Sequence, residues 1–458
     1  MTKESNNRLL LDSYWNNSIV QSNLRKLQEL IAQPSIFAQD IGLKEAATYL
    51  KSIFEAAGAQ VILDETYKAP FLLASFNSHK ASAKTIIFYN HYDTVPADSD
   101  QLWTSDPFSL TIRDDFMYAR GVDDDKGHII ARLSAVENYL ATYGELPVNI
   151  IFIMEGAEES ASVDLEHYLE SYKDKLDKAD LLIWEQGIRN EKNQLELTGG
   201  NKGIVTFDIE VDSATSDIHS KYGGVIESAT WYLIEALSSL REKDGSIAIK
   251  ALYDHCVQPN QRELELIESY ALENEVLLEK LYGLQLPMLQ SDRKSFLKRY
   301  YFEPSLTIQG LQSGYLGQGV KTIIPSKASA KMEIRLVPGL KPKEVFEAVK
   351  EYLYQQGFNA LKITYTFGEE SYRSDLTSSE IEHLIAVLKK HYDKGLSLLP
   401  TSAGTGPMHT VFQALEVPMV SFGLGNNDSR DHAGDENVSI DDYCTHIHLI
   451  EELIKSYE

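Results

Sequence analysis

The chain has 458 residues, which exceeds the size of one hydrophobic core and predicts at least two domains. Its formal net charge of −25 weighs against nucleic acid or an anionic membrane as a partner, because both are polyanions. A hydrophobic fraction of 43% predicts a folded chain rather than a disordered one. The sequence has no apolar run of the ~18 residues that span a bilayer, no signal-peptide core, and only Cys256 and Cys444 as cysteines. We therefore expect a cytoplasmic protein whose thiols stay reduced.

Residues 1–199 alternate between strand and helix patterns. A helix is predicted from Leu43 to Ala57, and a second one behind Lys126, where apolar residues recur on one face. Strands are predicted at 61–63, 71–76, 85–89, 148–154 and 181–184. Strands that alternate with helices in this way predict an α/β fold, with a mostly parallel sheet and helices on both of its faces.

The pattern changes at Gly199 and Gly200. The predicted elements that follow are a strand at 203–211, a helix at 229–240, a strand from Leu306, a glycine-rich loop at 310–319, a strand at 328–336, a helix around 345–352 and a strand at 361–367. Their order resembles a β-α-β-β-α-β unit, a ferredoxin-like α+β arrangement, with a charged and largely helical insertion at 241–302.

The α/β pattern resumes after Asp375. A helix is predicted at 379–392 and a last strand at 417–422. We therefore predict one α/β domain at 1–199 and 377–458, and a smaller α+β domain at 200–376 inserted into it.

Acidic and imidazole side chains follow the short apolar runs of the larger domain. They are His91 with Asp93, Asp124, Glu158 with Glu159, Glu185 and, near the end of the chain, His432. An open α/β sheet binds its ligands beyond the carboxyl ends of its strands, so we expect these side chains to share one crevice. Imidazole and carboxylate are ligands of divalent metals, and the set predicts a site for two metal ions.

Each of these residues, taken alone, also has an ordinary structural explanation. Asp124 precedes a helix, where aspartate is a common N-cap. Glu185 ends a strand, His432 lies in a polar loop, and Glu158 with Glu159 would suit the solvated start of a helix. Their occurrence in order at crevice positions favours the metal site. One of the two adjacent glutamates could then bind metal while the other takes a proton from water, because neighbouring side chains point in different directions.

These motifs resemble those of the di-metal peptidase and deacylase family that contains carboxypeptidase G, acetylornithine deacetylase, succinyl-diaminopimelate desuccinylase and the carnosine dipeptidases. The resemblance covers nearly the whole chain and is strongest to the cytosolic, carnosine-type dipeptidases. The segments that carry this closer likeness are 216–220, 223–224, 303–310, 321–325 and 334–338.

The resemblance implies a role for each candidate residue. The metal ligands would be His91, Asp124, Glu159, Glu185 and His432. Asp124 would bridge two divalent ions per subunit, zinc or alternatively manganese. Asp93 would orient His91, and Glu158 would be the general acid and base. His219 would reach the active site of a neighbouring subunit and help to hold the oxyanion.

The resemblance also implies which residues bind the substrate and which function each domain has. Arg335 would hold the terminal carboxylate of the substrate, helped by Thr322, Gly404 and Thr405. The larger domain would be catalytic, and the smaller one would be both a lid and the interface of a homodimer.

The chain departs from the carnosine-type pattern in two places. It has Thr401 to Thr405 where those dipeptidases have an arginine-containing stretch, and Asp435 where they have asparagine. A pocket that is less positive by one or two charges weighs against carnosine as the substrate, but not against hydrolysis of an amide bond.

The sequence therefore predicts a cytoplasmic, homodimeric di-zinc metallopeptidase that cleaves the amide bond of dipeptides or short peptides. An N-acyl amino acid deacylase with the same machinery is the nearer alternative, and a non-catalytic dimeric binding protein is the farther one. Release of amino acids from dipeptides or from N-acyl amino acids separates the first two. The binding protein would require loss of a ligand or of the base, and all of those positions are filled.

Overall fold

The computed structural model describes residues 3–98, 102–270, 283–289 and 292–458, and its chain divides into two compact units. The first unit comprises Met1–Gly200, Ser374–Leu399 and Thr410–Glu458, and the second comprises Asn201–Arg373 and Pro400–His409. The segment Pro400–His409 thus clusters with the second unit, whereas the sequence analysis placed it in the larger domain. None of the helices in the described ranges has the length and apolar character needed to cross a membrane.

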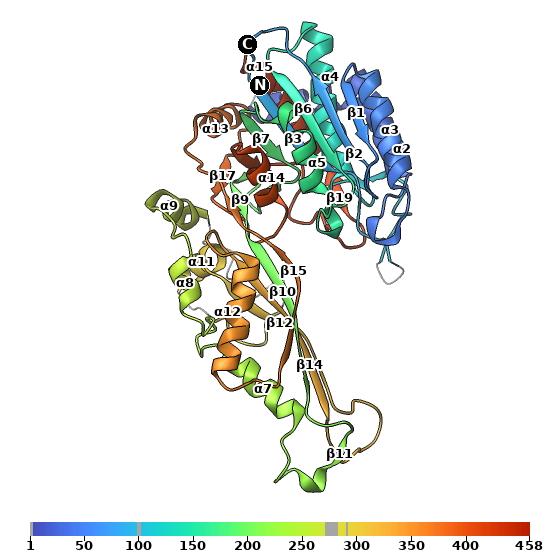
Figure 1. Ribbon diagram of the computed structural model, residues 1–458. Helices are drawn as coiled ribbons and strands as arrows, with labels where there is room; N and C mark the ends of the chain where they lie inside the picture. Colours follow the sequence, from blue (N-terminus) through green and yellow to red (C-terminus); the bar gives the residue numbers. More distant parts are fainter. Residues whose placement is uncertain (1–2, 99–101, 271–282, 290–291) are drawn as a thin grey trace. The chain divides into compact units, whose positions relative to one another are not determined.

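An eight-stranded sheet lies at the centre of the first unit (Figure 1). Its strands, in spatial order, are β1 (Gln60–Asp64), β2 (Phe71–Phe76), β6 (Asn149–Glu155), β3 (Thr85–His91), β7 (Leu181–Trp184), β18 (Met419–Ser421), β8 (Leu195–Thr198) and β17 (Leu396–Leu399). The pairs β6–β3, β3–β7, β7–β18 and β8–β17 are parallel, and the remaining pairs are antiparallel. The predicted mostly parallel sheet is confirmed, although β8 and β17 were not predicted.

Helices flank this sheet, and most of them share one apolar core with it. They are α1 (Lys3–Trp15), α2 (Ser18–Ile31), α3 (Leu43–Ala56), α4 (Lys126–Tyr143), α5 (Leu165–Ser171), α6 (Lys173–Leu176), α13 (Ser379–His391), α14 (Met408–Leu415) and α15 (Ile440–Lys455). Helix α4 contacts both α2 and α15, and α13 packs on α15. Strand β3 is buried along its whole length, as expected for a parallel strand covered on both faces. A small sheet of β19 (Asn437–Ser439), β5 (Phe116–Tyr118) and β4 (Thr111–Arg113) completes this unit.

The second unit has a four-stranded antiparallel sheet with its own apolar core. The strand order is β12 (Ser305–Ser313), β14 (Lys327–Leu336), β10 (Gly203–Asp212) and β15 (Lys362–Glu369). With α7 (Ala229–Ser239) and α12 (Pro342–Gln355), these strands form the predicted β-α-β-β-α-β unit. The predicted loop start at Gly310 is wrong, because β12 continues to Ser313 after a shift of register between Ile308 and Gly310.

The remaining elements of the second unit are short. Strands β11 (Ile218–His219) and β13 (Ile323–Ile324) pair with each other, and β9 (Gly200–Asn201) and β16 (Tyr372–Arg373) are two-residue strands. Helices α8 (Ala251–His255), α9 (Gln261–Tyr270) and α11 (Arg293–Phe302) belong to the predicted helical insertion, of which residues 271–282 and 290–291 lie outside the described residues.

Candidate active site

The carboxyl ends of four neighbouring strands carry the candidate metal ligands of the first unit. His91 is the last residue of β3, and Glu158 and Glu159 follow β6 in a single 3-10 turn. Glu185 directly follows β7, and His432 lies in the loop after β18. Because β6, β3, β7 and β18 are parallel neighbours, these side chains meet at one edge of the sheet.

Asp124 lies between the two histidines. Its Oδ1 is 2.9 Å from Nε2 of His91, and its Oδ2 is 3.0 Å from Nε2 of His432. Oε2 of Glu185 lies 3.8 Å from Nε2 of His91, and Oε2 of Glu159 lies 3.2 Å from Nε2 of His432. Two three-residue groups therefore share the Asp124 carboxylate. In the group of Asp124, Glu159 and His432, the potential ligand atoms all lie within 4.8 Å of one another.

The burial of these carboxylates fits metal ligands better than the ordinary explanations. Oε1 of Glu159 and Oε2 of Glu185 are buried and have no hydrogen-bond partner among the described residues. A buried carboxylate oxygen without a partner is costly, and a bound cation would supply that partner. Asp124 is not the N-cap of α4 either, because Asp125 occupies that position. Imidazole nitrogen together with carboxylate oxygen is a donor set that suits zinc.

Negative charge is concentrated at this edge of the sheet. Burial, opposed by His91 and reinforced by Glu159, raises the pKa of Glu158 well above its ordinary value. Burial and repulsion from Glu158 likewise raise the pKa of Glu185. Hydrogen bonds to Asp124 and Glu159 raise the pKa of His432 to about 11. Each of these shifts favours uptake of positive charge, so the site is one that attracts cations.

Asp93 contacts both the histidine and the glutamate pair. Its Oδ1 lies 3.4 Å from Nδ1 of His91, whose closer contact, at 3.0 Å, is the Asp93 carbonyl oxygen. The same carboxylate accepts hydrogen bonds from the backbone N–H of Glu158 at 3.1 Å and of Glu159 at 3.2 Å. Asp93 is fully buried. Asp93 therefore contacts the His91 ring mainly through its carbonyl oxygen, and its carboxylate holds the turn that carries Glu158 and Glu159.

The loop that carries Asp124 is held by Glu436, a residue for which the sequence analysis predicted no role. The Glu436 carboxylate accepts hydrogen bonds from the backbone N–H groups of Gly121, Asp123 and Asp124, and pairs with Arg120 at 2.7 Å. Burial raises the pKa of Glu436, partly offset by the charge of Arg120. The carboxylate thus acts as an internal cap for the loop that positions Asp124.

Arg132 of α4 fixes the ends of two strands and was also missed. Its guanidinium donates to the carbonyl oxygens of Tyr89 in β3, Trp184 in β7 and Glu185, at 3.1, 2.6 and 2.8 Å. The side chain is fully buried. Its signal in the sequence was a charged residue inside the most apolar part of a predicted helix.

Asp435 is the acid that replaces asparagine in the departure from the carnosine-type pattern. Its carboxylate lies 3.2 Å from Nη2 of Arg113 and accepts hydrogen bonds from the backbone and hydroxyl of Thr104. Burial is outweighed by these contacts, which lower the pKa of Asp435. Its negative charge is therefore balanced locally, within the first unit.

The other candidate residues lie in the second unit and form two groups. In the first group, Nη1 of Arg335 donates to Oγ1 of Thr405 at 2.6 Å, and Nε pairs with Oε1 of Glu333 at 2.6 Å. The Gly404 carbonyl accepts a hydrogen bond from the backbone N–H of Lys202 at 2.8 Å. The Thr405 hydroxyl therefore helps to fix the direction of the Arg335 guanidinium.

The second group lies at the other end of the long strands. His219 in β11 pairs with Ile323, and the Thr322 carbonyl accepts from the backbone N–H of Ser220 at 3.0 Å. Figure 1 places β11 beyond the end of β14 at which that strand starts, whereas Arg335 is near its last residue. The eight residue steps from Lys327 to Arg335 span about 27 Å of extended chain. The second unit therefore keeps His219 and Thr322 apart from Arg335 and Thr405.

Known proteins resemble this chain over most of its length. The model of peptidase family M20/M25/M40 matches residues 87–456. The crystal structure of an M20 family metallo-carboxypeptidase from Sulfolobus solfataricus has 35% sequence identity, covers 95% of this chain and 99% of its own, and superposes with a TM-score of 0.86. A Beta-Ala-His dipeptidase of Mus musculus is 28% identical over 81% of this chain and 76% of its own length. A Cys-Gly metallodipeptidase of Schizosaccharomyces pombe is 27% identical over 92% of this chain and 94% of its own length.

The chain therefore belongs to peptidase family M20/M25/M40, which confirms the resemblance inferred from its motifs. It is an enzyme, a metal-dependent hydrolase of the peptidase class.

Proposed function

We propose that this protein is a di-metal peptidase that hydrolyses the peptide bond of dipeptides or short peptides, with Glu158 as the general base. The observation that carries the proposal is the Asp124 carboxylate, which faces one histidine with each oxygen, with Glu158 in the adjoining turn. The names of two relatives, a Beta-Ala-His dipeptidase and a Cys-Gly metallodipeptidase, support the substrate class and do not favour the deacylase alternative.

The geometry supports two metal positions. His91, Asp124 and Glu185 would hold one ion, and His432, Asp124 and Glu159 the other. Zinc suits these donors best, and manganese is the alternative. When bound, such ions act as Lewis acids that polarise the scissile carbonyl and lower the pKa of water. The shared Asp124 carboxylate would offset the repulsion between the two dications.

Glu158 would move the protons of the reaction. Its carboxylate accepts a proton from the attacking water and returns it to the amine that leaves. Burial raises its pKa, and a raised pKa makes the carboxylate a stronger base toward the proton of water. The hydrogen bonds between Asp93 and the turn of Glu158 would hold the base in place.

Arg335 would bind the terminal carboxylate of the substrate. A guanidinium has five N–H donors and matches a carboxylate in two-point contact, and the contacts with Glu333 and Thr405 use only part of that capacity. Glu333 reduces the net charge at this position, so a purely structural ion pair is the competing explanation. Gly404 and Thr405 would then shape the pocket on one side of the guanidinium.

The separation of the two groups in the second unit supports a homodimer. A dipeptide is about 7 Å long, far shorter than the ~27 Å of extended strand between Lys327, where β14 begins, and Arg335. If all these residues contact one substrate, His219 and Thr322 must come from a second copy of the chain. His219 is exposed, as a group that acts in trans has to be.

Exposed apolar residues mark a surface through which two copies could pair. Strand β12 is an edge strand of its sheet and exposes Ile308 and Leu311, which are 48% and 55% accessible. Trp231 of α7 is 62% accessible, and Leu316 and Val320 are almost fully exposed. An edge strand with exposed apolar side chains favours pairing with another chain.

We also propose a cytoplasmic location, with which the unpaired, buried thiols of Cys256 and Cys444 are compatible.

A substrate panel tests the proposed reaction. Protein loaded with zinc or with manganese should release amino acids from unmodified dipeptides much faster than from N-acyl amino acids, as measured by chromatography of the free amino acids. The same dipeptides blocked at the N-terminus separate a dipeptidase from a carboxypeptidase, because only a carboxypeptidase tolerates the block. Faster release from N-acyl amino acids would replace the peptidase proposal by the deacylase.

Glu158→Gln should keep its metals and lose turnover. The amide has the shape of the carboxylate but cannot accept the proton of water, and general acid–base groups contribute about 10²–10⁴-fold to the rate. Asp124→Ala is the matched comparison, since loss of the shared carboxylate should remove both metals. Elemental analysis and kcat should be measured on both variants. A metal-replete Glu158→Gln enzyme with near-normal kcat would exclude Glu158 as the base.

Arg335→Met should raise KM for dipeptides with a free carboxylate far more than for their C-terminal amides. Methionine keeps much of the packing of the stem but has no charge to pair with the substrate. Arg335→Lys keeps the charge without the planar fork and should give an intermediate effect. If Arg335→Met raised KM equally for dipeptides with a free carboxylate and for their C-terminal amides, Arg335 would have only a structural role in its pair with Glu333.

His219→Ala should lower kcat without changing the metal content. If His219 acts in trans, mixing this variant with Glu158→Gln should restore activity, because one site of each heterodimer then has both groups. Statistical exchange predicts about a quarter of wild-type activity. The control mixture of Glu158→Gln with Asp124→Ala should stay inactive, because both changes damage the chain's own site. Verified subunit exchange without rescue would exclude the contribution in trans.

A further inference from the structure

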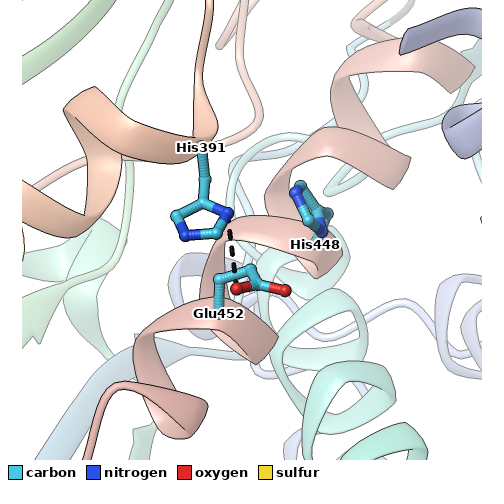
Figure 2. Close-up of side chains that lie close together, drawn as sticks. All are labelled: His391, His448 and Glu452. Carbon is cyan, nitrogen blue, oxygen red and sulfur yellow. Dashed lines mark ion pairs between the residues drawn. The ribbon is translucent and has the colours of Figure 1, made fainter. Parts of the chain in front are cut away.

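A second group of potential metal ligands lies between two helices of the first unit. His391 is the last residue of α13, and His448 and Glu452 are four residues apart on α15, so they share one face of that helix. Each offers an atom that lies within 4.8 Å of the atoms offered by the other two. Nδ1 of His391 is 3.3 Å from Oε2 of Glu452. Figure 2 shows the two imidazole rings and the carboxylate gathered around a common point.

The contacts of His448 indicate which of its nitrogens is available. The Tyr14 hydroxyl donates its hydrogen to Oε2 of Glu451 at 2.9 Å and also lies 3.2 Å from Nδ1 of His448. A hydroxyl has one hydrogen, so Nδ1 of His448 must be the donor to the Tyr14 oxygen. The neutral ring then has its lone pair on Nε2. A histidine held in this way, through its other nitrogen, is the usual arrangement at metal sites.

An ion pair alone explains only part of this arrangement. The contact of His391 with Glu452 needs no second imidazole, yet His448 is placed beside it and is only 9% exposed. The side chains of His391 and Glu452 are 20% and 22% exposed, so an ion could enter from solvent. Two imidazoles and one carboxylate form a three-ligand set that suits zinc, with water in the remaining position, and does not suit magnesium or calcium.

This group is separate from the candidate active site. It shares no residue with the Asp124 cluster. Its three residues belong to α13 and α15, whereas those of the Asp124 cluster end or follow strands of the sheet or lie in loops. The two clusters therefore involve different elements of the unit.

We propose that His391, His448 and Glu452 form an additional binding site for a zinc-like transition-metal ion, which ties α13 to α15. Through Tyr14 the same site also engages α1, so metal binding there would fasten three helices that are distant in sequence. The role is structural, and it goes beyond the proposed peptidase function.

Zinc content is the direct test. The purified full-length protein should be equilibrated with buffered zinc, and zinc per subunit measured by elemental mass spectrometry for wild type, His448→Gln and Glu452→Gln. Each variant should lose about one zinc ion per subunit and keep its hydrolytic activity, since neither residue belongs to the active site. His383→Gln is the matched control, because His383 also lies on α13 but bonds only to the Ser456 hydroxyl, at 2.7 Å, in the contacts described. It should bind as much zinc as the wild type.

The result does not depend on the peptidase proposal, because it is a difference in zinc content between chains with the same active site. Equal zinc content in wild type, His448→Gln and Glu452→Gln would overturn the additional site. If His448→Gln fails to fold, Glu452→Gln together with a zinc-edge anomalous map of wild-type crystals decides. An anomalous peak about 2.0–2.2 Å from the ligand atoms of these residues supports the site, and its absence from zinc-soaked crystals refutes it.

Discussion

Buried negative charge has to be balanced by positive charge, and this requirement governs the sheet edge of the first unit. Asp124 is held between two imidazoles, and Glu436 is held by Arg120 together with backbone N–H groups. Lys126, which starts α4, is fully buried, and burial lowers its pKa to about 7. These basic side chains lie around the carboxylate cluster. Oε1 of Glu159 and Oε2 of Glu185 nevertheless have no hydrogen-bond partner among the described residues, and a bound cation would neutralise them. The charge distribution therefore favours metal binding, in addition to the needs of the chemistry.

The charged residues behind the ligands make the edge of the sheet rigid. Arg132 joins the ends of β3 and β7 by donating hydrogen bonds to their carbonyl groups. Glu436 holds the loop before α4, because its carboxylate accepts hydrogen bonds from three backbone N–H groups of that loop. Ligands that are placed by such internal bonds need little rearrangement when an ion binds, which favours affinity.

Much of this arrangement could be predicted from the sequence, for physical reasons. Long apolar runs such as that of β6 identify buried parallel strands, and the acids and histidines that follow such runs lie at one edge of the sheet. The short strands β8 and β17 carry too few residues for a pattern to emerge. Arg132 and Glu436 were missed because a charge that bonds to backbone atoms leaves no spacing rule in the sequence. The distance between His219 and Arg335 depends on the length and register of β14, which no local motif encodes.

The double contact of Asp93 links two properties that are usually treated separately. The ring of His91, a candidate metal ligand, and the turn of the proposed base both contact the Asp93 carboxylate. Shortening, lengthening or neutralising that side chain would alter metal affinity and proton transfer at the same time. Selection could therefore not adjust either property through position 93 without changing the other. In the directed evolution of this scaffold, better targets lie farther out, at residues such as Glu333, which pairs with the proposed substrate-binding Arg335 and has no described contact with His91 or the Glu158 turn.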